Sequence, residues 1–340
     1  MGKKKLLIDL ISYIIPYSFV LGLRTLFKKE LVVLAYHRVC DIKKESYKFD
    51  IELVSASRNS FDYQIKHIKK YYNPISMEQL IDSIERKVSL PKRPILITFD
   101  DGFDDNYLNA FPILKKYNVP ATIFLSTGYI DTNNVIWFDR LASLIFLTDL
   151  NTLNISEIGK TYNLGAVKSK RGEIMEIICE DLKLIPNIER EKILNDLYDK
   201  YENIEEMDAS QSKMLDWNQV KEMNSSIINF GSHTVTHPIL SRLTNEELDY
   251  ELLESKKQIE LNLNSPINSI SYPNGNESSY NDLVINKAKS FGYKVGFTYI
   301  PGNNPLPIKN NFILKRLHIE SYTDNNYFRF LLCFPSFLSN

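Results

Sequence analysis

The sequence predicts an α/β fold in which a parallel, barrel-like sheet is covered by helices. Three observations support this prediction: seven short apolar runs recur from Leu31 onward, the runs lack polar alternation, and segments with helical spacing lie between them. A continuous apolar run indicates a strand buried on both faces, as in a parallel sheet covered by helices. With 340 residues, of which 44% are hydrophobic and 24% charged, the chain has the composition of a folded globular protein.

The first 30 residues differ from the rest of the chain. They begin with Met1-Gly2-Lys3-Lys4-Lys5, and the uncharged stretch from Leu10 to Leu23 has 14 residues. This stretch is shorter than the ~20 residues that span a bilayer, but it suits an apolar helix lying at the membrane interface. We therefore expect residues 1–30 to be membrane-associated. A signal peptide without a recognisable cleavage site, or an apolar helix packed on the protein's own body, is the alternative.

The body of the chain alternates between predicted strands and helices. Helical spacing places Phe61, Ile65 and Ile68 on one face of a helix, and it predicts further helices over Met77–Val88 and Glu246–Leu263. The predicted strands, in chain order, are Leu31–Tyr36, Ile95–Phe99, Ala121–Ser126, Ile227–Phe230, Ser269–Tyr272, Lys294–Tyr299 and Ile313–Ile319.

A helical insertion at 138–216 interrupts this alternation. It contains helical segments at 172–184 and 188–201 and no evident strand, and we expect it to cap or border the barrel. No Pro-, Gly- or Ser-rich linker separates the insertion from its surroundings, so we include it in one domain over 31–322, with a separate domain as the alternative. Residues 323–340 are expected to form an apolar C-terminal tail.

The net charge argues against nucleic-acid binding, and the cysteine content argues against disulfide or thiolate–zinc stabilisation. A formal net charge of −1 leaves no general basic field, so we expect no nucleic-acid partner. The cysteines, Cys40, Cys179 and Cys333, are odd in number, widely spaced and without a CxxC pair. They predict neither a disulfide framework nor a thiolate zinc site, and they favour a reducing compartment.

Polar residues follow the predicted strands at the end where α/β barrels build their active sites. Four of the five histidines lie at these strand ends, and only His67 falls on a predicted helix. Such clustering is difficult to explain by packing. The residues concerned are His37, Asp100, Asp101, His233, His237, Tyr272, Asn274, Arg316 and His318.

Two of these groups indicate a metal site. The HxxxH spacing of His233 and His237 lets both imidazoles reach one ion, although a capping or core role is the alternative. The adjacent Asp100 and Asp101 would repel each other unless a cation or a proton lies between them. Two imidazoles and one carboxylate leave positions open on a divalent ion, which can make water nucleophilic near neutral pH while a second carboxylate acts as general base. Hydrolysis is the chemistry indicated.

The motifs together resemble those of a known family. Thr98–Gly102 (TFDDG) and His233–Pro238 (HTVTHP) are similar to the two leading motifs of the polysaccharide deacetylases, the NodB-homology or family-4 carbohydrate esterases. Ala35–Val39 and Ser271–Gly275 resemble the branch associated with bacterial exopolysaccharide deacetylation. The resemblance covers about Leu31–Glu320. It implies a distorted (β/α)7 barrel, in agreement with the seven runs.

The resemblance also implies roles for individual residues. It makes Asp100 the general base, and it makes Asp101, His233 and His237 the ligands of Zn²⁺ or a similar divalent ion. The backbone N–H of Asn274 occupies the position of a donor to the tetrahedral oxyanion.

The sequence departs from the family pattern in its third motif, where Ser271 replaces an arginine that orients the base. We expect Arg316 to take over that task. His318 matches the position of a histidine that protonates the leaving amine, and His37 competes for this role. Tyr272 is a candidate to stack on a sugar ring, with a core position as the alternative.

The resemblance thus implies a hydrolase of non-peptide carbon–nitrogen bonds. We expect it to remove N-acetyl groups from N-acetylhexosamines of a bacterial surface polysaccharide or a lipid-linked precursor oligosaccharide. An O-acetyl carbohydrate esterase and a non-catalytic membrane-associated glycan-binding protein are the alternatives. The unpaired cysteines and the missing cleavage site favour the cytoplasmic face of a bacterial membrane, with the cell surface or secretion as the alternative.

Overall fold

The computed structural model of the chain describes residues 17, 21–24, 28–42, 47, 49–167, 171–200, 212–224 and 226–335. Most of the segment 1–30 and the last five residues lie outside these ranges, so the predicted N-terminal apolar helix stays a prediction. Within the described ranges, no helix is both long and apolar enough to cross a membrane.

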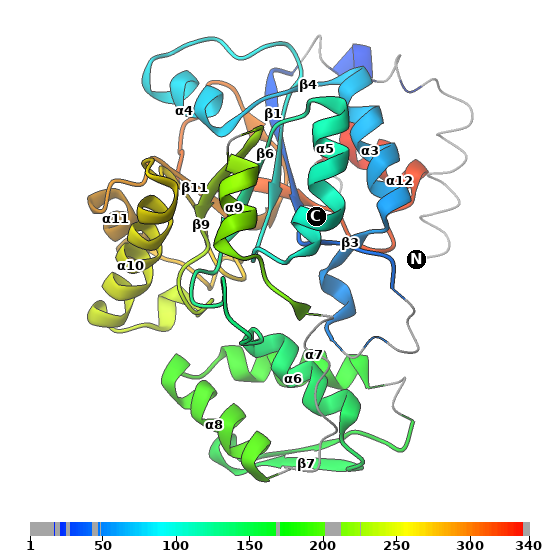
Figure 1. Ribbon diagram of the computed structural model, residues 1–340, viewed down its shortest axis with the longest axis vertical. Helices are drawn as coiled ribbons and strands as arrows, with labels where there is room; N and C mark the ends of the chain where they lie inside the picture. The colour runs from blue at the N-terminus through cyan, green and yellow to red at the C-terminus, as the bar shows by residue number, and fades with distance from the viewer. Residues whose placement is uncertain are drawn as a thin grey trace.

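Seven parallel strands form a closed barrel (Figure 1). Around the barrel they follow chain order, and β1 closes it by pairing with both β5 and β13. The predicted seven-stranded barrel is therefore confirmed. Its strands are β1 (Glu30–Tyr36), β5 (Pro94–Phe99), β6 (Ala121–Leu125), β9 (Ile228–Ser232), β10 (Ser269–Ser271), β11 (Val295–Pro301) and β13 (Leu314–His318).

The barrel is distorted on one side. The pair β9–β10 is joined at a single register position, Ile270 opposite Ser232, and the register of β11 against β13 shifts between Phe297 and Pro301. The opposite pair, β1–β5, stays in register over five positions. Two short strands, β4 (Asn73–Pro74) and β12 (Asn304–Pro305), pair with β5 and β1. A separate two-stranded parallel sheet is formed by β2 (Arg38–Val39) and β3 (Val54–Ala56).

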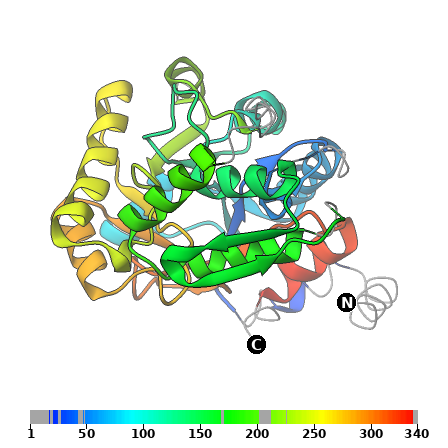
Figure 2. The same ribbon diagram turned by 90° about the horizontal axis from the view of Figure 1, so that it is seen from below.

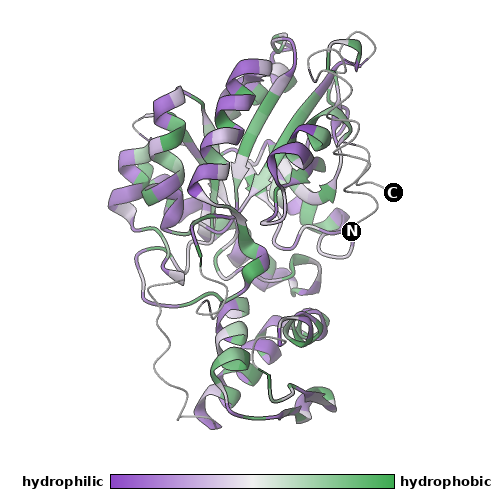
Figure 3. Cartoon of the chain, turned by 90° about the vertical axis from the view of Figure 1, so that its right-hand side faces the viewer, coloured by the Kyte–Doolittle hydropathy of each residue, from purple (hydrophilic) through white to green (hydrophobic). Residues whose placement is uncertain are grey.

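The apolar runs supply two cores, because successive side chains of a strand point to opposite faces. In β1, Leu31 and Val33 belong to an interior cluster that also contains Phe124 of β6 and Phe297 of β11. Val32, Leu34 and Tyr36 belong to a second cluster, which lies between the strands and the helices. Figure 3 shows the apolar strands enclosed by helices with hydrophilic outer faces. This burial on both faces explains why the runs lack polar alternation.

Helices pack around the outside of the barrel. Five of them begin at an N-cap residue whose side chain accepts from the first turn: Ser57 for α3, Ser76 for α4, Thr244 for α10, Asn281 for α11 and Asp324 for α12. The outer helices are α3 (Arg58–Tyr71), α4 (Met77–Glu85), α5 (Phe111–Tyr117), α9 (Trp217–Asn224), α10 (Asn245–Leu263), α11 (Asp282–Ser290) and α12 (Asn325–Cys333). Single turns occur at η1 (Ile51–Leu53), η2 (Asn106–Ala110), η3 (Ser156–Ile158) and η6 (Leu240–Arg242).

The segment predicted as an apolar tail contains helix α12, which packs on α3. The rings of His67 and Phe328 are 6.0 Å apart, and the hydroxyl of Tyr72 donates to the carbonyl of Leu332 at 3.1 Å. The described part of this segment thus helps to cover the barrel.

The insertion forms a lobe at the C-terminal ends of the barrel strands (Figures 1 and 2). It comprises α6 (Trp137–Leu147), β7 (Thr152–Ile155), β8 (Lys160–Asn163), α7 (Gly172–Lys183) and α8 (Asn187–Lys200). The expectation that it contains no strand is wrong, because β7 and β8 pair as an antiparallel hairpin. Each strand has only four residues, and in β8 only Tyr162 is buried, so the period-two signal is too short to recognise.

Candidate metal centre

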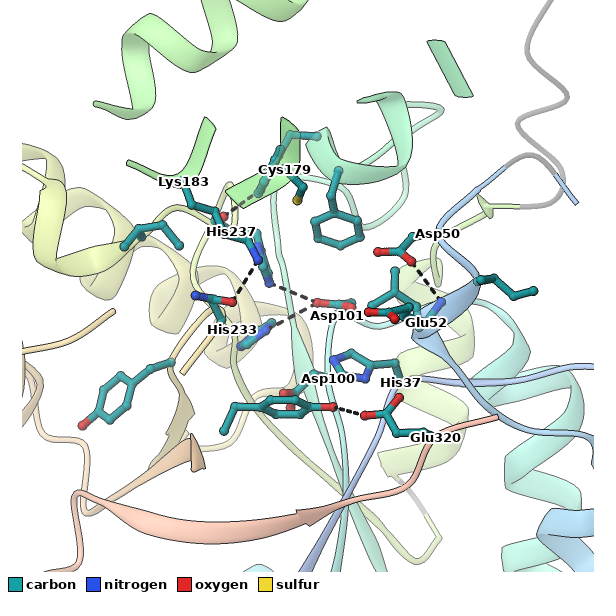
Figure 4. A pocket seen from close by; sticks show the side chains of 18 of the residues that line it. His37, Asp50, Glu52, Asp100, Asp101, Cys179, Lys183, His233, His237 and Glu320 are labelled. Atoms are coloured by element: carbon teal, nitrogen blue, oxygen red, sulfur yellow. Dashed lines mark hydrogen bonds and ion pairs between the residues drawn. The ribbon is translucent and has the colours of Figure 1, made fainter. Parts of the chain in front are cut away.

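A cavity of about 420 Å³ opens at the C-terminal ends of the barrel strands (Figure 4). Asp100 and Asp101 reach it from the loop after β5, while His233 and His237 reach it from the loop after β9. These residues are distant in sequence and meet because parallel strands end at the same rim of the barrel.

Asp101, His233 and His237 form a compact triad. The Oδ1 atom of Asp101 lies 3.4 Å from Nε2 of His233 and 3.4 Å from Nε2 of His237. All three residues are buried, and their potential ligand atoms lie within 4.8 Å of one another. Figure 4 shows both imidazoles converging on the carboxylate. The structure thus brings together the three predicted ligands.

The triad fits a divalent cation. Both carboxylate oxygens of Asp101 are buried without a hydrogen-bond partner among the described residues. Burial and the neighbouring Asp100 raise the pKa of Asp101 well above its usual range. An unpaired buried carboxylate is costly, and a bound cation would remove that cost. Two imidazoles and one carboxylate suit Zn²⁺ and related divalent ions, and they leave coordination positions for water or substrate.

Neighbouring groups favour the tautomer of His233 and the neutral form of both imidazoles that metal binding requires. Nδ1 of His233 lies 2.8 Å from the carbonyl oxygen of Ser271, which can only accept, so Nδ1 carries the proton and Nε2 presents its lone pair. Burial lowers the pKa of His233 and of His237, which favours the neutral form that binds metals. Phe138 packs edge-on against His237 with ring centroids 5.2 Å apart.

The site loops contain several residues in the left-handed backbone region. These are Asp101, Thr234, His237 and Asn274, with φ between 56° and 74°. Such conformations cost of order 1–3 kcal/mol each for residues other than glycine, and surrounding contacts must maintain them.

Glu251 on α10 provides such contacts for the loop that carries both histidines. Its Oε2 accepts from the backbone N–H groups of Val235 at 2.7 Å and Thr236 at 3.0 Å, and its Oε1 accepts from the Thr236 hydroxyl at 2.6 Å. One buried carboxylate therefore holds the turn between the two imidazoles.

Asp100 is held as a carboxylate beside the triad. Arg316 donates to both of its oxygens, at 2.8 and 2.7 Å, and the hydroxyl of Ser271 donates at 3.2 Å. Burial alone would raise the pKa of Asp100, but the guanidinium of Arg316 holds it well below its usual range. The expected contact between Arg316 and Asp100 is thus present. Ser271, in place of the family's arginine, adds a second donor.

Asn274 lines the same cavity. Its backbone N–H has no acceptor among the described residues, and its side-chain amide donates to Ser279 Oγ at 3.0 Å. The position therefore leaves a backbone donor available for a ligand.

His318 does not lie where a proton donor is expected. Among the described residues it is absent from the cavity wall, because its ring stacks on Tyr299 at 3.5 Å between centroids. Burial lowers its pKa to about 3. His37 lines the wall instead, and burial lowers its pKa to about 4. The structure does not support His318 as the acid.

Tyr272 lines the cavity, but its ring is buried and stacks on Tyr280 at 5.1 Å. One ring face is therefore already occupied by protein. Both readings of this residue, core position and sugar contact, agree with that placement.

Several residues of the cavity wall are not among the site residues predicted from the sequence. They are Asp50, Glu52, Cys179, Lys183, Tyr299 and Glu320. Glu320 lies two residues after His318, at the end of a predicted strand, so its position is one that indicates a site residue. Burial raises its pKa to about 7, and burial together with Asp139 does the same for Asp50. Lys183 carried no signal, because it lies within the insertion rather than after a barrel strand.

The family model described as polysaccharide deacetylase matches residues 87–296. A poly-β-1,6-N-acetyl-D-glucosamine N-deacetylase of Staphylococcus aureus is 36% identical over 93 residues, which are 27% of this chain and 32% of that protein. The match thus spans about a third of the length of this relative.

Solved structures show the same fold. The Streptococcus pyogenes deacetylase PplD, in complex with acetate, superposes with a TM-score of 0.57 at 21% identity, covering 88% of this chain and 96% of that one. BC0361, a polysaccharide deacetylase from Bacillus cereus, gives 0.57 at 22% identity over 90% and 70% of the two chains.

Proposed function

The chain belongs to the polysaccharide deacetylase family, and we propose that it is a metal-dependent N-deacetylase of a bacterial exopolysaccharide. The observation that carries the proposal is the triad of Asp101, His233 and His237 beside an Asp100 that Arg316 keeps ionised. The relative named as a poly-β-1,6-N-acetyl-D-glucosamine N-deacetylase supports N-acetylglucosamine as the acetylated sugar.

Each residue of the site contributes one part of amide hydrolysis. Asp101, His233 and His237 would hold the ion, for which we propose Zn²⁺, and the ion would lower the pKa of water and polarise the acyl oxygen. Asp100 accepts the proton of the attacking water, since its carboxylate is ionised and its orientation is set by Arg316. The N–H of Asn274 donates to the acyl oxygen as negative charge develops there.

The leaving amine requires a proton, and the cavity wall offers two candidates. Glu320 has a pKa near 7 and accepts a hydrogen bond from the Tyr299 hydroxyl at 3.1 Å. His37 lies on the same wall, with its ring 5.5 Å from that of Tyr299. Either group would act from the side of the cavity formed by β1 and β13.

The direct test is the release of acetate and free amine from poly-β-1,6-N-acetylglucosamine oligomers by zinc-loaded and chelator-treated protein. We expect metal-dependent release of both products in equal amounts. Parallel assays on O-acetylated sugars separate the esterase alternative. Protein that binds zinc tightly but releases acetate from neither class would overturn the proposed activity.

We further propose that residues 1–30 attach the enzyme to a membrane surface, on the strength of their apolar and lysine-flanked sequence. Cell fractionation of the full chain and of a variant lacking these residues tests the attachment. Equal membrane fractions for both proteins would contradict it, and protease accessibility in intact cells would identify the membrane face.

A further inference from the structure

The helical insertion contacts the metal centre from two directions. At its first helix, the indole N–H of Trp137 donates to the carbonyl oxygen of His237 at 3.2 Å, and Phe138 packs on the His237 ring. At α7, Cys179 and Lys183 lie one turn apart and both line the cavity (Figure 4). The insertion therefore forms part of the wall of the site.

Lys183 connects this wall to the loop of Asn274. Its ammonium donates to the side-chain oxygen of Asn274 at 3.2 Å and to Glu180 at 2.7 Å. An ammonium has three donors, so one remains after these two contacts. The side chain is 20% exposed, and it is the one lysine or arginine among the described residues that line the cavity. Five carboxylates line the same space, namely Asp50, Glu52, Asp100, Asp101 and Glu320.

The position of this charge matters for the reaction. Asn274 has a left-handed backbone, with φ of 60°, and its unpaired N–H is the expected donor to the acyl oxygen. A positive charge at this end of a buried, otherwise acidic cavity would favour an anionic acyl oxygen or carboxylate, because charges interact strongly where water is scarce. The contact to Asn274 also fixes the loop that presents the donor.

We propose that Lys183 is a positioning residue of the acyl end of the site, holding Asn274 and attracting the negative charge that forms there. The inference rests on the proposed deacetylase function. It makes the insertion part of the catalytic apparatus, and it names an anion subsite that the barrel motifs do not contain.

Acetate, the product of the proposed reaction, is the probe. Its affinity for zinc-loaded protein is measured by calorimetric titration for the wild type, Lys183→Met, Lys183→Gln and Lys183→Arg. We expect Lys183→Met to weaken acetate binding by about tenfold, the loss typical of a charged hydrogen bond. Lys183→Arg should restore most of the affinity, whereas Lys183→Gln keeps a donor for Asn274 but not the charge.

The matched control is Lys160→Met, because Lys160 lies in the same insertion and pairs with Asp181 rather than lining the cavity. We expect it to bind acetate as the wild type does, with zinc content unchanged in all variants. Where oligomers are hydrolysed, Lys183→Met should lower kcat by roughly 10- to 100-fold while KM changes little.

The outcomes separate the two proposals. Acetate affinity that depends on Lys183, without hydrolysis of any oligomer, supports the subsite and contradicts the proposed substrate. Hydrolysis by the wild type together with unchanged acetate affinity and kcat in Lys183→Met overturns the inference and leaves the deacetylase standing. A zinc-loaded wild type that binds no acetate also overturns it.

Discussion

At the scale of single residues, two adjacent carboxylates receive opposite environments. Asp100 accepts from Arg316 and Ser271, whereas the oxygens of Asp101 face His233 and His237 and find no donor among the described residues. Paired with a guanidinium, the first stays ionised. The second gains a partner only when a cation is bound. The proposed division into base and metal ligand rests on this difference between the surroundings of the two side chains.

Asp100→Asn separates these roles. Because an amide cannot accept the proton of water, we expect activity to fall by roughly 10²- to 10⁴-fold while bound zinc stays at the wild-type level. Acetate release and metal analysis of the same samples measure both. Asp82→Asn, on the exposed surface of α4, is the control and should retain activity. Loss of zinc in Asp100→Asn would contradict the assignment.

Asp101→Asn tests the cost of the unpaired carboxylate. At pH 7.5 without metal, we expect this variant to melt at or above the wild-type temperature, since it removes an uncompensated buried acid. Zinc at 100 times its dissociation constant should stabilise the wild type by about 2.7 kcal/mol and leave the variant nearly unchanged. Thermal denaturation with and without zinc measures the difference. Equal zinc responses would rule out Asp101 as a ligand.

At the scale of secondary-structure elements, the outer helices contact either the loops of the site or one another. Helix α10 places Glu251 under the turn between the two proposed histidine ligands, and helix α3 places His67 against α12. The first contact joins an outer helix to the site, and the second joins two outer helices to each other. Each contact can be tested by a substitution that leaves the three proposed metal ligands unchanged.

Glu251→Gln should weaken zinc binding by about 10- to 100-fold, the effect typical of groups that orient metal ligands. The amide keeps the size of the side chain but presents one acceptor oxygen to a loop that now uses two. Competition with a chromophoric chelator measures the affinity. Glu254→Gln, on the same helix and bonded to Gln258, is the control. Unchanged affinity in Glu251→Gln would show that the loop holds its shape unaided.

His67 predicts a pH dependence of stability away from the site. Burial, with help from Arg329 and Lys70, lowers its pKa from 6.5 to about 4. The unfolded chain therefore binds the proton more readily, so folding stability is complete above pH 6.5 and declines as the pH falls toward 4. In metal-free protein, we expect the melting temperature of His67→Phe to fall less between pH 7 and pH 5 than that of the wild type. Parallel curves would contradict this.

At the scale of the whole molecule, the insertion and the barrel share one apolar core. Leu153 and Leu194 of the insertion belong to the same buried cluster as Phe61 and Phe99 around the barrel. The insertion start is also tied to a barrel loop, since the backbone N–H of Asp50 donates to Asp139 at 3.2 Å. This continuity indicates a single cooperative unit.

We therefore expect one unfolding transition. Tryptophan fluorescence reports on the boundaries of the insertion, because the two tryptophans of the chain are Trp137 and Trp217. Far-ultraviolet circular dichroism reports on the whole chain. Coincident denaturation curves from the two probes would confirm cooperativity. A separate early transition in fluorescence would instead indicate an insertion that unfolds independently.

Much of the barrel and of the triad could be predicted from sequence because both leave local signals. Strands such as Ile95–Phe99 are continuous apolar runs, and the ligands follow them in short, unusual motifs. The hairpin of the insertion was missed because four-residue strands carry too little periodicity. The stacking of His318 on Tyr299 of the neighbouring strand could not be predicted, because strand alternation does not show which side chains of adjacent strands meet.

The sequence by itself determined the order of strands and helices, the polar residues at the strand ends and the family to which they belong. Only the tertiary structure decided which groups meet. The support of Glu251 for the histidine loop and the contact of Lys183 with Asn274 join residues 16 and 91 positions apart. Such contacts depend on barrel closure and on the packing of the insertion over it. No local pattern encodes that geometry.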